Sequence, residues 1–247
     1  MIGRTLKGVV HILAGLGAGL AIILVLLAWR LSSGPISLAF LSPYIEDALD
    51  GMGGGAGILL DDTILTWGGW DRTLDVRVIN VRLLGPDKAA VASIPEVAVS
   101  ISLKALVRGI VVPKSIDLIG PRLWLKRRSD GGLEAGLGGD TQPSAGLFKR
   151  LAGELMAAPD PARAMSYLER INIIDANLTI VDRALEKFWR APSAQANLRR
   201  VAGGIRGELS FDLEMKDANP HFTVIGTYLA GKERLDLGIE FTKVRPA

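Results

Sequence analysis

The chain has 247 residues, no cysteine, 49% hydrophobic residues and a formal net charge of +3. The lack of cysteine excludes disulfide frameworks, thiolate metal sites and cysteine nucleophiles. Its Lys and Arg residues form no lysine-rich tract with interleaved aromatics, so the composition argues against nucleic-acid binding and fits a chain close to anionic lipid headgroups.

The first element is an uncharged apolar run at residues 9–29, VVHILAGLGAGLAIILVLLAW. A helix of this length rises about 31 Å, which matches the hydrocarbon core of a bilayer. A cleavable signal peptide has a shorter apolar run and a small-x-small cleavage site, and a soluble core helix has a polar stripe. The run therefore predicts an uncleaved single-pass transmembrane anchor.

The charges beside this run predict its orientation. Arg4 and Lys7 precede it, whereas Arg30 alone follows closely, with acidic residues beyond. The positive-inside rule then places the N-terminus in the cytoplasm and the bulk of the chain across the membrane.

Three regions follow from this reading. Residues 1–31 are the cytoplasmic N-terminus and the anchor, and residues 32–57 are a linker with a short helix that starts at Ser42-Pro43. Residues 58–247 form an antiparallel β domain, with a helical insertion around 145–169 where leucines recur at helical spacing.

Alternation with a period of two dominates the β domain, and short connections between its strands predict antiparallel pairing. The phase slips by one residue near Ile79, which predicts a bulge. Gly131–Pro143 is rich in glycine and reads as a loop. The visible helices are too small to cover so many strands, so the sheet either curls on itself or lines an apolar groove.

Apolar residues on one face of three strands are the candidates for lining that groove. They are Val97, Val99, Ile101 and Leu103, then Leu209, Phe211 and Leu213, and finally Leu235, Leu237 and Ile239. The chain stops one step beyond the last of these strands, with no helix to protect the edge. We therefore expect that the chain is the front end of a longer β structure, or that its last edge pairs with another subunit.

Catalytic and metal-binding patterns are missing from the sequence. His11 and His221 have no spaced partner, and Asp61-Asp62 are adjacent in a strand, so their side chains point to opposite faces. We expect no enzyme, no cofactor and no metal site.

Two further clusters each have two readings. Lys126-Arg127-Arg128 can contact lipid headgroups or simply end a strand in water. Trp67 and Trp70 can form an aromatic belt at a membrane interface or fill the core at a hairpin tip.

Several segments resemble the N-terminal region of the AsmA-like proteins, closest to their YhdP branch and more distantly TamB. They are GPISLAFLSPYIEDAL, LDVRVINVRLL, IPEVAVSISLKALVRGIVVPKSIDLIGPRLWLKRRSDGG and LERINIIDANLTIVD. The resemblance implies a curled, groove-like β sheet in the periplasm, anchored in the inner membrane. It also implies phospholipid transport between the membranes, support of outer-membrane integrity and no catalytic residues.

The expected partners are membrane lipids, through their acyl chains, and other envelope proteins. The bottom-up pattern agrees, because an apolar sheet face with little cover can accept acyl chains without specific polar contacts. The alternative is a structural module of the envelope that recruits a protein by strand addition, without carrying lipid.

Overall fold

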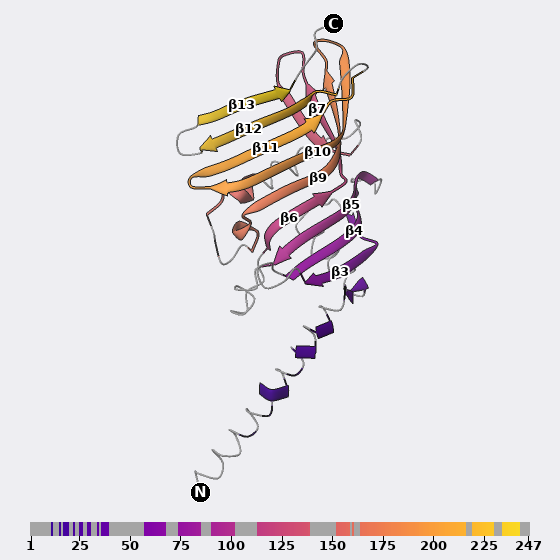
Figure 1. Ribbon diagram of the computed structural model, residues 1–247, viewed down its shortest axis with the longest axis vertical. Helices are drawn as coiled ribbons and strands as arrows, with labels where there is room; N and C mark the ends of the chain where they lie inside the picture. The colour runs from indigo at the N-terminus through magenta and orange to yellow at the C-terminus, as the bar shows by residue number, and fades with distance from the viewer. Residues whose placement is uncertain are drawn as a thin grey trace.

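The computed structural model shows a mainly β protein with few helices, which confirms this part of the predicted fold (Figure 1). Besides scattered positions between residues 11 and 39, the structure describes residues 57–67, 74–84, 90–101, 113–138, 152–158, 160, 164–215, 219–229 and 234–242.

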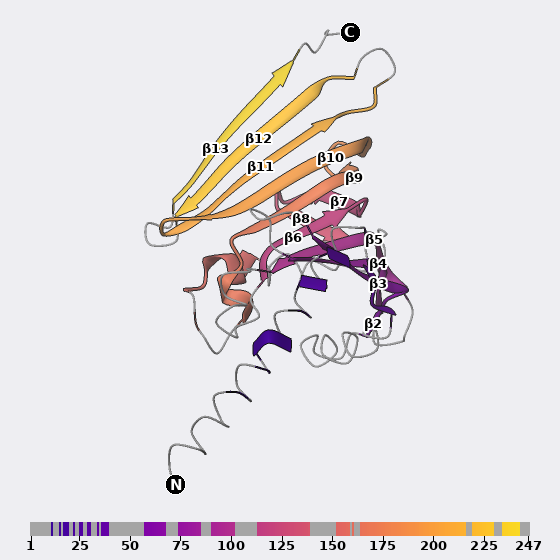
Figure 2. The same ribbon diagram turned by 60° about the horizontal axis from the view of Figure 1, so that its bottom comes forward.

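The strands form a single 13-stranded sheet that is not closed (Figure 2). The first half contains β1 (Ile36–Ser37), β2 (Ile58–Leu59), β3 (Asp62–Trp67), β4 (Leu74–Leu84), β5 (Ala90–Ile101), β6 (Pro113–Ile119), β7 (Arg122–Arg127) and β8 (Leu133–Leu137). The second half contains β9 (Arg170–Asp182), β10 (Lys187–Val201), β11 (Gly204–Asp212), β12 (His221–Leu229) and β13 (Arg234–Thr242). The strand order is β1-β3-β4-β5-β6-β9-β10-β11-β12-β13, with β2 beside β4, and with β7 between β8 and β9.

The sheet is mixed, so the prediction of antiparallel pairing throughout is wrong for two strands. β6 and β7 both run parallel to β9, and their registers show that they are one strand interrupted at Gly120-Pro121. Parallel neighbours need a long connection, which the stretch between Leu137 and Arg170 supplies.

The prediction of a loop over Gly131–Pro143 is wrong for its first part, because Leu133–Leu137 forms β8. This strand pairs with β7 and places Gly136 opposite Trp124. A Cβ atom at Gly136 would lie only 2.5 Å from the Trp124 ring, so the glycine that signalled a loop instead makes room for an indole.

A line of irregular residues, which we call the crease, crosses five neighbouring strands. Asn80, Gly120 and Asp175 have positive φ angles of 53°, 69° and 52°. The registers place Asn80 opposite Pro95, Pro95 opposite Gly120, and Gly120 opposite Asp175. The side chain of Ser193 on β10 then donates a hydrogen bond to Asp175 at 3.0 Å. The strands bend at corresponding points, so the sheet folds across its own strands (Figure 1).

The crease explains the phase slip that the sequence showed near Ile79. Val78 and Val81 are both buried although they are three residues apart. The register with β5 is nevertheless the same on both sides of Asn80, so no residue is inserted and the predicted bulge is wrong. A true register shift occurs on β10, between Ala191 and Ala194.

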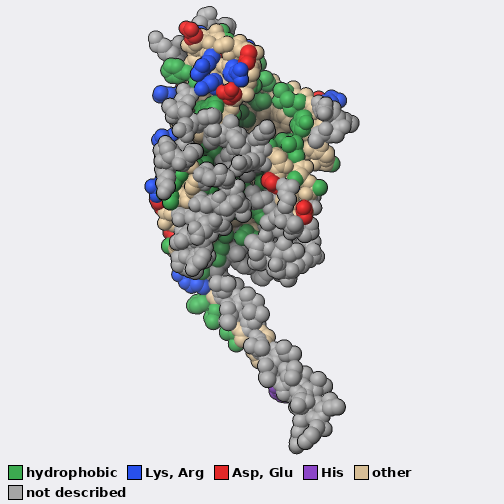
Figure 3. Space-filling view, turned by 180° about the vertical axis from the view of Figure 1, so that it is seen from behind, with side chains coloured by type: hydrophobic (Ala, Val, Ile, Leu, Met, Phe, Trp, Pro, Cys, Tyr) green, Lys and Arg blue, Asp and Glu red, His purple; other side chains and the backbone are tan. Residues whose placement is uncertain are grey.

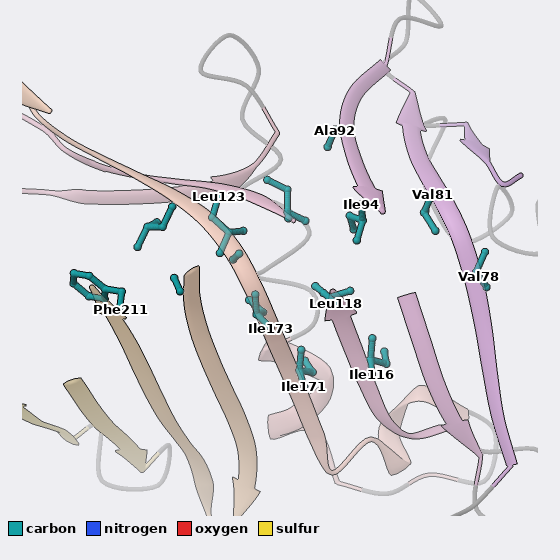
Figure 4. Packing of buried hydrophobic residues seen from close by; sticks show 14 of the residues in the cluster. Val78, Val81, Ala92, Ile94, Ile116, Leu118, Leu123, Ile171, Ile173 and Phe211 are labelled. Carbon is teal, nitrogen blue, oxygen red and sulfur yellow. The ribbon is translucent and has the colours of Figure 1, made fainter. Parts of the chain in front are cut away.

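The core fills the hollow of the bent sheet, where side chains from strands distant in the sequence converge (Figure 4). Two short helical segments, at residues 152–156 and at η2 (Ala164–Tyr167), lie within the predicted insertion. Arg200 on β10 holds both: its Nε donates to the carbonyl of Leu155 at 2.8 Å, and its Nη2 donates to Glu154 at 2.7 Å and Ser166 at 2.6 Å.

The described positions within residues 9–29 are helical. No helix among the described residues combines the length and apolar character needed to cross a membrane. Within the predicted linker, Ile36–Ser37 forms β1 and pairs with β3, whereas the helix predicted from Ser42-Pro43 lies outside the described residues.

Candidate functional site

The predicted groove residues that the structure describes lie on one face of the sheet. Directly opposite residues in neighbouring strands share a face, so the strand registers define continuous rows. One row crosses nine strands through Thr63, Val78, Val97, Leu118, Ile173, Ala196, Leu209, Val224 and Ile239. We call the face that carries this row the inner face.

Exposure rises steeply along this row. Leu118 and Ile173 are only 4% exposed, whereas Ile239 at the far edge is 63% exposed. Leu209 and Val224 between them are half-buried. The inner face is therefore a packed core under β4–β9 and an open apolar surface on β12 and β13. Figure 3 shows hydrophobic side chains along a hollow on this side of the molecule.

The open end carries a ladder of aromatic rings. The Phe211 and Phe222 rings stack with centroids 5.4 Å apart, and the Phe241 ring lies 6.2 Å from that of Phe222. Phe211 is buried, and Phe241 is 63% exposed. Of these three, only Phe211 was predicted as a groove residue, although Phe222 and Phe241 follow the alternation of their own strands.

The other apolar candidates divide between the two parts of the inner face. Val97, Val99, Leu209 and Leu213 are partly buried against the core, and Ile101 is half-buried at the end of β5. Leu235 and Leu237 are 58% and 64% exposed on β13. Leu103 and Trp70 lie outside the described residues, and Trp67 is placed only as the last residue of β3, so the interface reading of the tryptophans stays a prediction.

Each residue of the basic cluster at the end of β7 has an intramolecular contact. Lys126 lies over the Trp124 ring, 5.3 Å from its centroid. Arg127 pairs with Asp182 at 3.1 Å, and Arg128 pairs with Asp130 at 2.6 Å. The nearby surface pocket of about 370 Å³ is lined by two carboxylates as well as by cations. The headgroup contact stays a prediction.

Asp182 fixes the turn between β9 and β10. Its Oδ1 accepts hydrogen bonds from the backbone N–H groups of Ala184 at 2.8 Å and Leu185 at 3.0 Å. The Leu185 N–H contributes most to lowering the pKa of this carboxyl group below its ordinary value, and Arg127 adds to the effect while burial opposes it. This is a structural use of a buried carboxylate.

The aspartate pair at positions 61 and 62 is also structural. Asp61 accepts hydrogen bonds from the side chains of Asn80 at 2.9 Å and Arg82 at 2.5 Å. Asp62 instead accepts from the Ser37 hydroxyl at 3.0 Å, which ties β1 to β3. The two carboxylates thus have separate partners and do not form a dyad.

One hydrogen-bonded chain has the residue types of a catalytic triad. His221 Nδ1 lies 2.8 Å from Asp212, and its Nε2 lies 3.4 Å from the Thr223 hydroxyl. The side chains of His221 and Asp212 are 46% and 58% exposed on an open strand surface. Because water competes there for the hydroxyl proton, this geometry does not activate a nucleophile. Among the described residues, no group of three or more acidic or histidine side chains is arranged to hold a metal ion.

The apolar inner face is therefore the candidate site, because it can bind an apolar partner by burying that partner's surface. No protein-family model matches this chain, and no curated protein or solved structure is significantly similar to it.

Proposed function

We propose that this chain is an AsmA-like protein of the cell envelope whose inner face holds phospholipid acyl chains. In this proposal residues 9–29 anchor it in the inner membrane, and the sheet lies in the periplasm. The protein then takes part in moving phospholipid between the two membranes and in maintaining the outer membrane, without breaking or forming covalent bonds.

The observation that carries the proposal is the open end of the inner face. Four large apolar side chains on β13 are each about 60% exposed: Leu235, Leu237, Ile239 and Phe241. Large contiguous apolar surface on a folded protein marks a binding site for an apolar partner. The surface is continuous with the core, so a bound chain would lie along a preformed wall.

The free energy of such binding comes from burial. Each methylene group removed from water contributes about 0.8 kcal/mol, so covering six of them supplies roughly 5 kcal/mol before ordering costs are subtracted. The described side chains of this wall are apolar, so the surface can accept different acyl chains and release them. A carrier needs such exchange, and a tight polar site would hinder it.

The test is photo-crosslinking of the full chain in bacterial membranes. A photoreactive amino acid replaces Leu237 in one variant and its neighbour Asp236, which points to the opposite face, in the matched control. A third variant carries it at Ile22 within the apolar run, as a reference for contact with bulk lipid. We expect phospholipid adducts at Leu237 and Ile22, identified by intact mass, and at least a fivefold lower yield at Asp236.

An adduct at Ile22 without one at Leu237 would refute lipid holding by the sheet and leave the anchor in place. Equal yields at Leu237 and Asp236 would also count against it, because they would mean nonspecific contact with the strand.

The second candidate function is that of an assembly module that recruits a protein by strand addition. The edge of β13 favours it, since among the described strands β13 pairs with β12 alone. This function does not require lipid binding at Leu237. It is tested instead by identifying the strand that pairs with the edge of β13.

A further inference from the structure

Among the described strands the outer edge of β13 is unpaired, and of the devices that normally protect a sheet edge it carries only charged side chains. All nine of its residues pair with β12 in one unbroken register, so no bulge twists the edge away. The strand, RLDLGIEFT, contains neither proline nor lysine, and all nine residues are exposed. Its charged residues Arg234, Asp236 and Glu240 alternate with the apolar ones and lie on the face opposite Leu237. This edge is therefore open to another strand.

The backbone groups that face outward can be identified from the ladder. The N–H of Leu213 donates to the carbonyl of Pro220 at 3.1 Å, which fixes the alternation between β11 and β12. The registers of β11 with β12 and of β12 with β13 are continuous, so the same alternation applies to β13. The backbone N–H and C=O groups of Arg234, Asp236 and the other even-numbered residues of β13 therefore point toward β12. The free donors and acceptors therefore belong to Leu235, Leu237, Ile239 and Phe241.

We propose that β13 pairs antiparallel with β13 of a second copy of this chain, with Leu237 opposite Leu237 on the twofold axis. This proposal concerns the edge of the sheet and does not rest on lipid binding at its face. A chain pairing with itself must use a register centred on one residue, so only a few alternatives exist.

Charge selects among these registers. Centring on Gly238 places Asp236 opposite Glu240 twice, and centring on Asp236 places two aspartates opposite each other; like charges directly opposite are destabilising. Centring on Leu237 instead places Arg234 opposite Glu240 twice and Asp236 opposite Gly238. Arg234 already contacts Asp236 at 2.7 Å, so each end of the pairing would hold one arginine between two carboxylates. Centring on Leu235 also places Arg234 opposite Asp236 twice but opposes only residues 234–236 of the strand, and centring on Ile239 brings no charges together.

The association is expected to be weak, because a single strand pair buries less than the roughly 1,000 Å² that a stable interface exceeds. A disulfide trap suits a weak complex, and the natural chain has no cysteine to interfere. Single cysteines are introduced at Asp236, Leu237, Gly238 and Ile239 of the full chain in mild detergent. A Cβ at Gly238 meets no atom within 4 Å, so even this substitution fits.

We expect the Leu237→Cys variant to form disulfide dimers in at least fivefold higher yield than the other three. In the proposed register the two Cα atoms of residue 238 are about 8 Å apart, beyond the reach of a disulfide, whereas those of residue 237 are about 5.5 Å apart. A maximum at another position overturns the register. No dimer from any variant overturns the pairing.

A second, independent test reverses the charges of the pairing and measures the dissociation constant of the dimer by analytical ultracentrifugation. We expect Glu240→Arg to weaken the dimer about tenfold, and the double variant Arg234→Glu with Glu240→Arg to restore it. A dimer that ignores these changes but is lost in Leu237→Asp would be held by the inner face and overturns the proposal. Arg234 and Glu240 lie on the face opposite Leu237, so we expect lipid adducts at Leu237 to persist in these variants. Loss of the dimer and loss of lipid binding can therefore be told apart.

Discussion

Replacing Arg200 by methionine is expected to release the two short helical segments from the inner face. The guanidinium donates three hydrogen bonds to backbone carbonyls of Glu154, Leu155 and Ser166, at 2.6–2.8 Å. Methionine keeps the apolar stem but leaves three carbonyls without this donor. At about 1–1.5 kcal/mol for each bond, the expected loss is about 3–4.5 kcal/mol in the free energy of opening.

Hydrogen exchange measured by mass spectrometry on the full chain in mild detergent tests this directly. Protection of residues 152–156 and 164–167 should fall by at least a hundredfold in the Arg200→Met variant, while β11 and β12 keep theirs. Arg199→Met is the matched control, because Arg199 is exposed on the other face and lies opposite Arg170 and Arg206. Removing one of three adjacent like charges should leave stability unchanged or slightly raised. Equal loss of protection in both variants would refute the clamp.

Three further predictions concern single positions in the sheet. Gly136→Ala should destabilise the protein by about 1–3 kcal/mol and shift its tryptophan fluorescence, because the new Cβ overlaps the Trp124 ring; unchanged thermal unfolding and emission would contradict this. Asp182 has a lowered pKa, so its stabilising effect is present above the unfolded value near 4 and is lost as the pH falls through the folded value. Thermal unfolding between pH 2 and 7 should lose part of this acid dependence in Asp182→Asn, and identical pH profiles would oppose it. Asn80→Gly should be tolerated, whereas Asn80→Val should cost about 1–2 kcal/mol in urea unfolding, because valine disfavours a φ of 53°; equal stabilities would exclude strain at the crease.

The regular part of the sheet was predictable because alternation records burial directly. Residues 209–215 and 235–242 alternate between apolar and other residues, and residues 222–228 do so except at Ile225 and Gly226. These segments overlap β11, β12 and β13. The shared inner face follows from the same pattern, since a strand exposes one face to water and turns the other toward apolar neighbours.

What the sequence did not reveal depends on contacts between distant segments. β8 was missed because Gly136 weakens the strand pattern, and its role appears only once Trp124 lies opposite it. The parallel pairing of β6 with β9 depends on which strands a long connection brings together. Arg200 looks like one of two equivalent arginines in the segment NLRRV, yet one side chain clamps helices while the other is exposed.

The sequence predicted the local irregularity at the crease but not its alignment across the strands. A polar residue that interrupts alternation, such as Asn80, signals a local change of phase. The same signal recurs at Asp175 in INIIDANLTIVD, but only the strand order shows that the two positions belong to one line across the sheet. Because these positions are aligned, the whole sheet bends along one line. The bent sheet encloses a core under β4–β9 and leaves the inner face of β12 and β13 open.

The two proposals for β13 use different groups of the same residues. The side chains of Leu235, Leu237, Ile239 and Phe241 lie on the inner face, where acyl chains would bind, whereas their outward backbone groups serve the edge. A twofold axis through Leu237, perpendicular to the sheet, would keep the inner faces of both copies on the same side. The open apolar surface of one copy would then continue into that of the other. Dimer formation would thus widen the proposed lipid-holding surface without covering it, so a dimer that blocked lipid adducts at Leu237 would contradict this geometry.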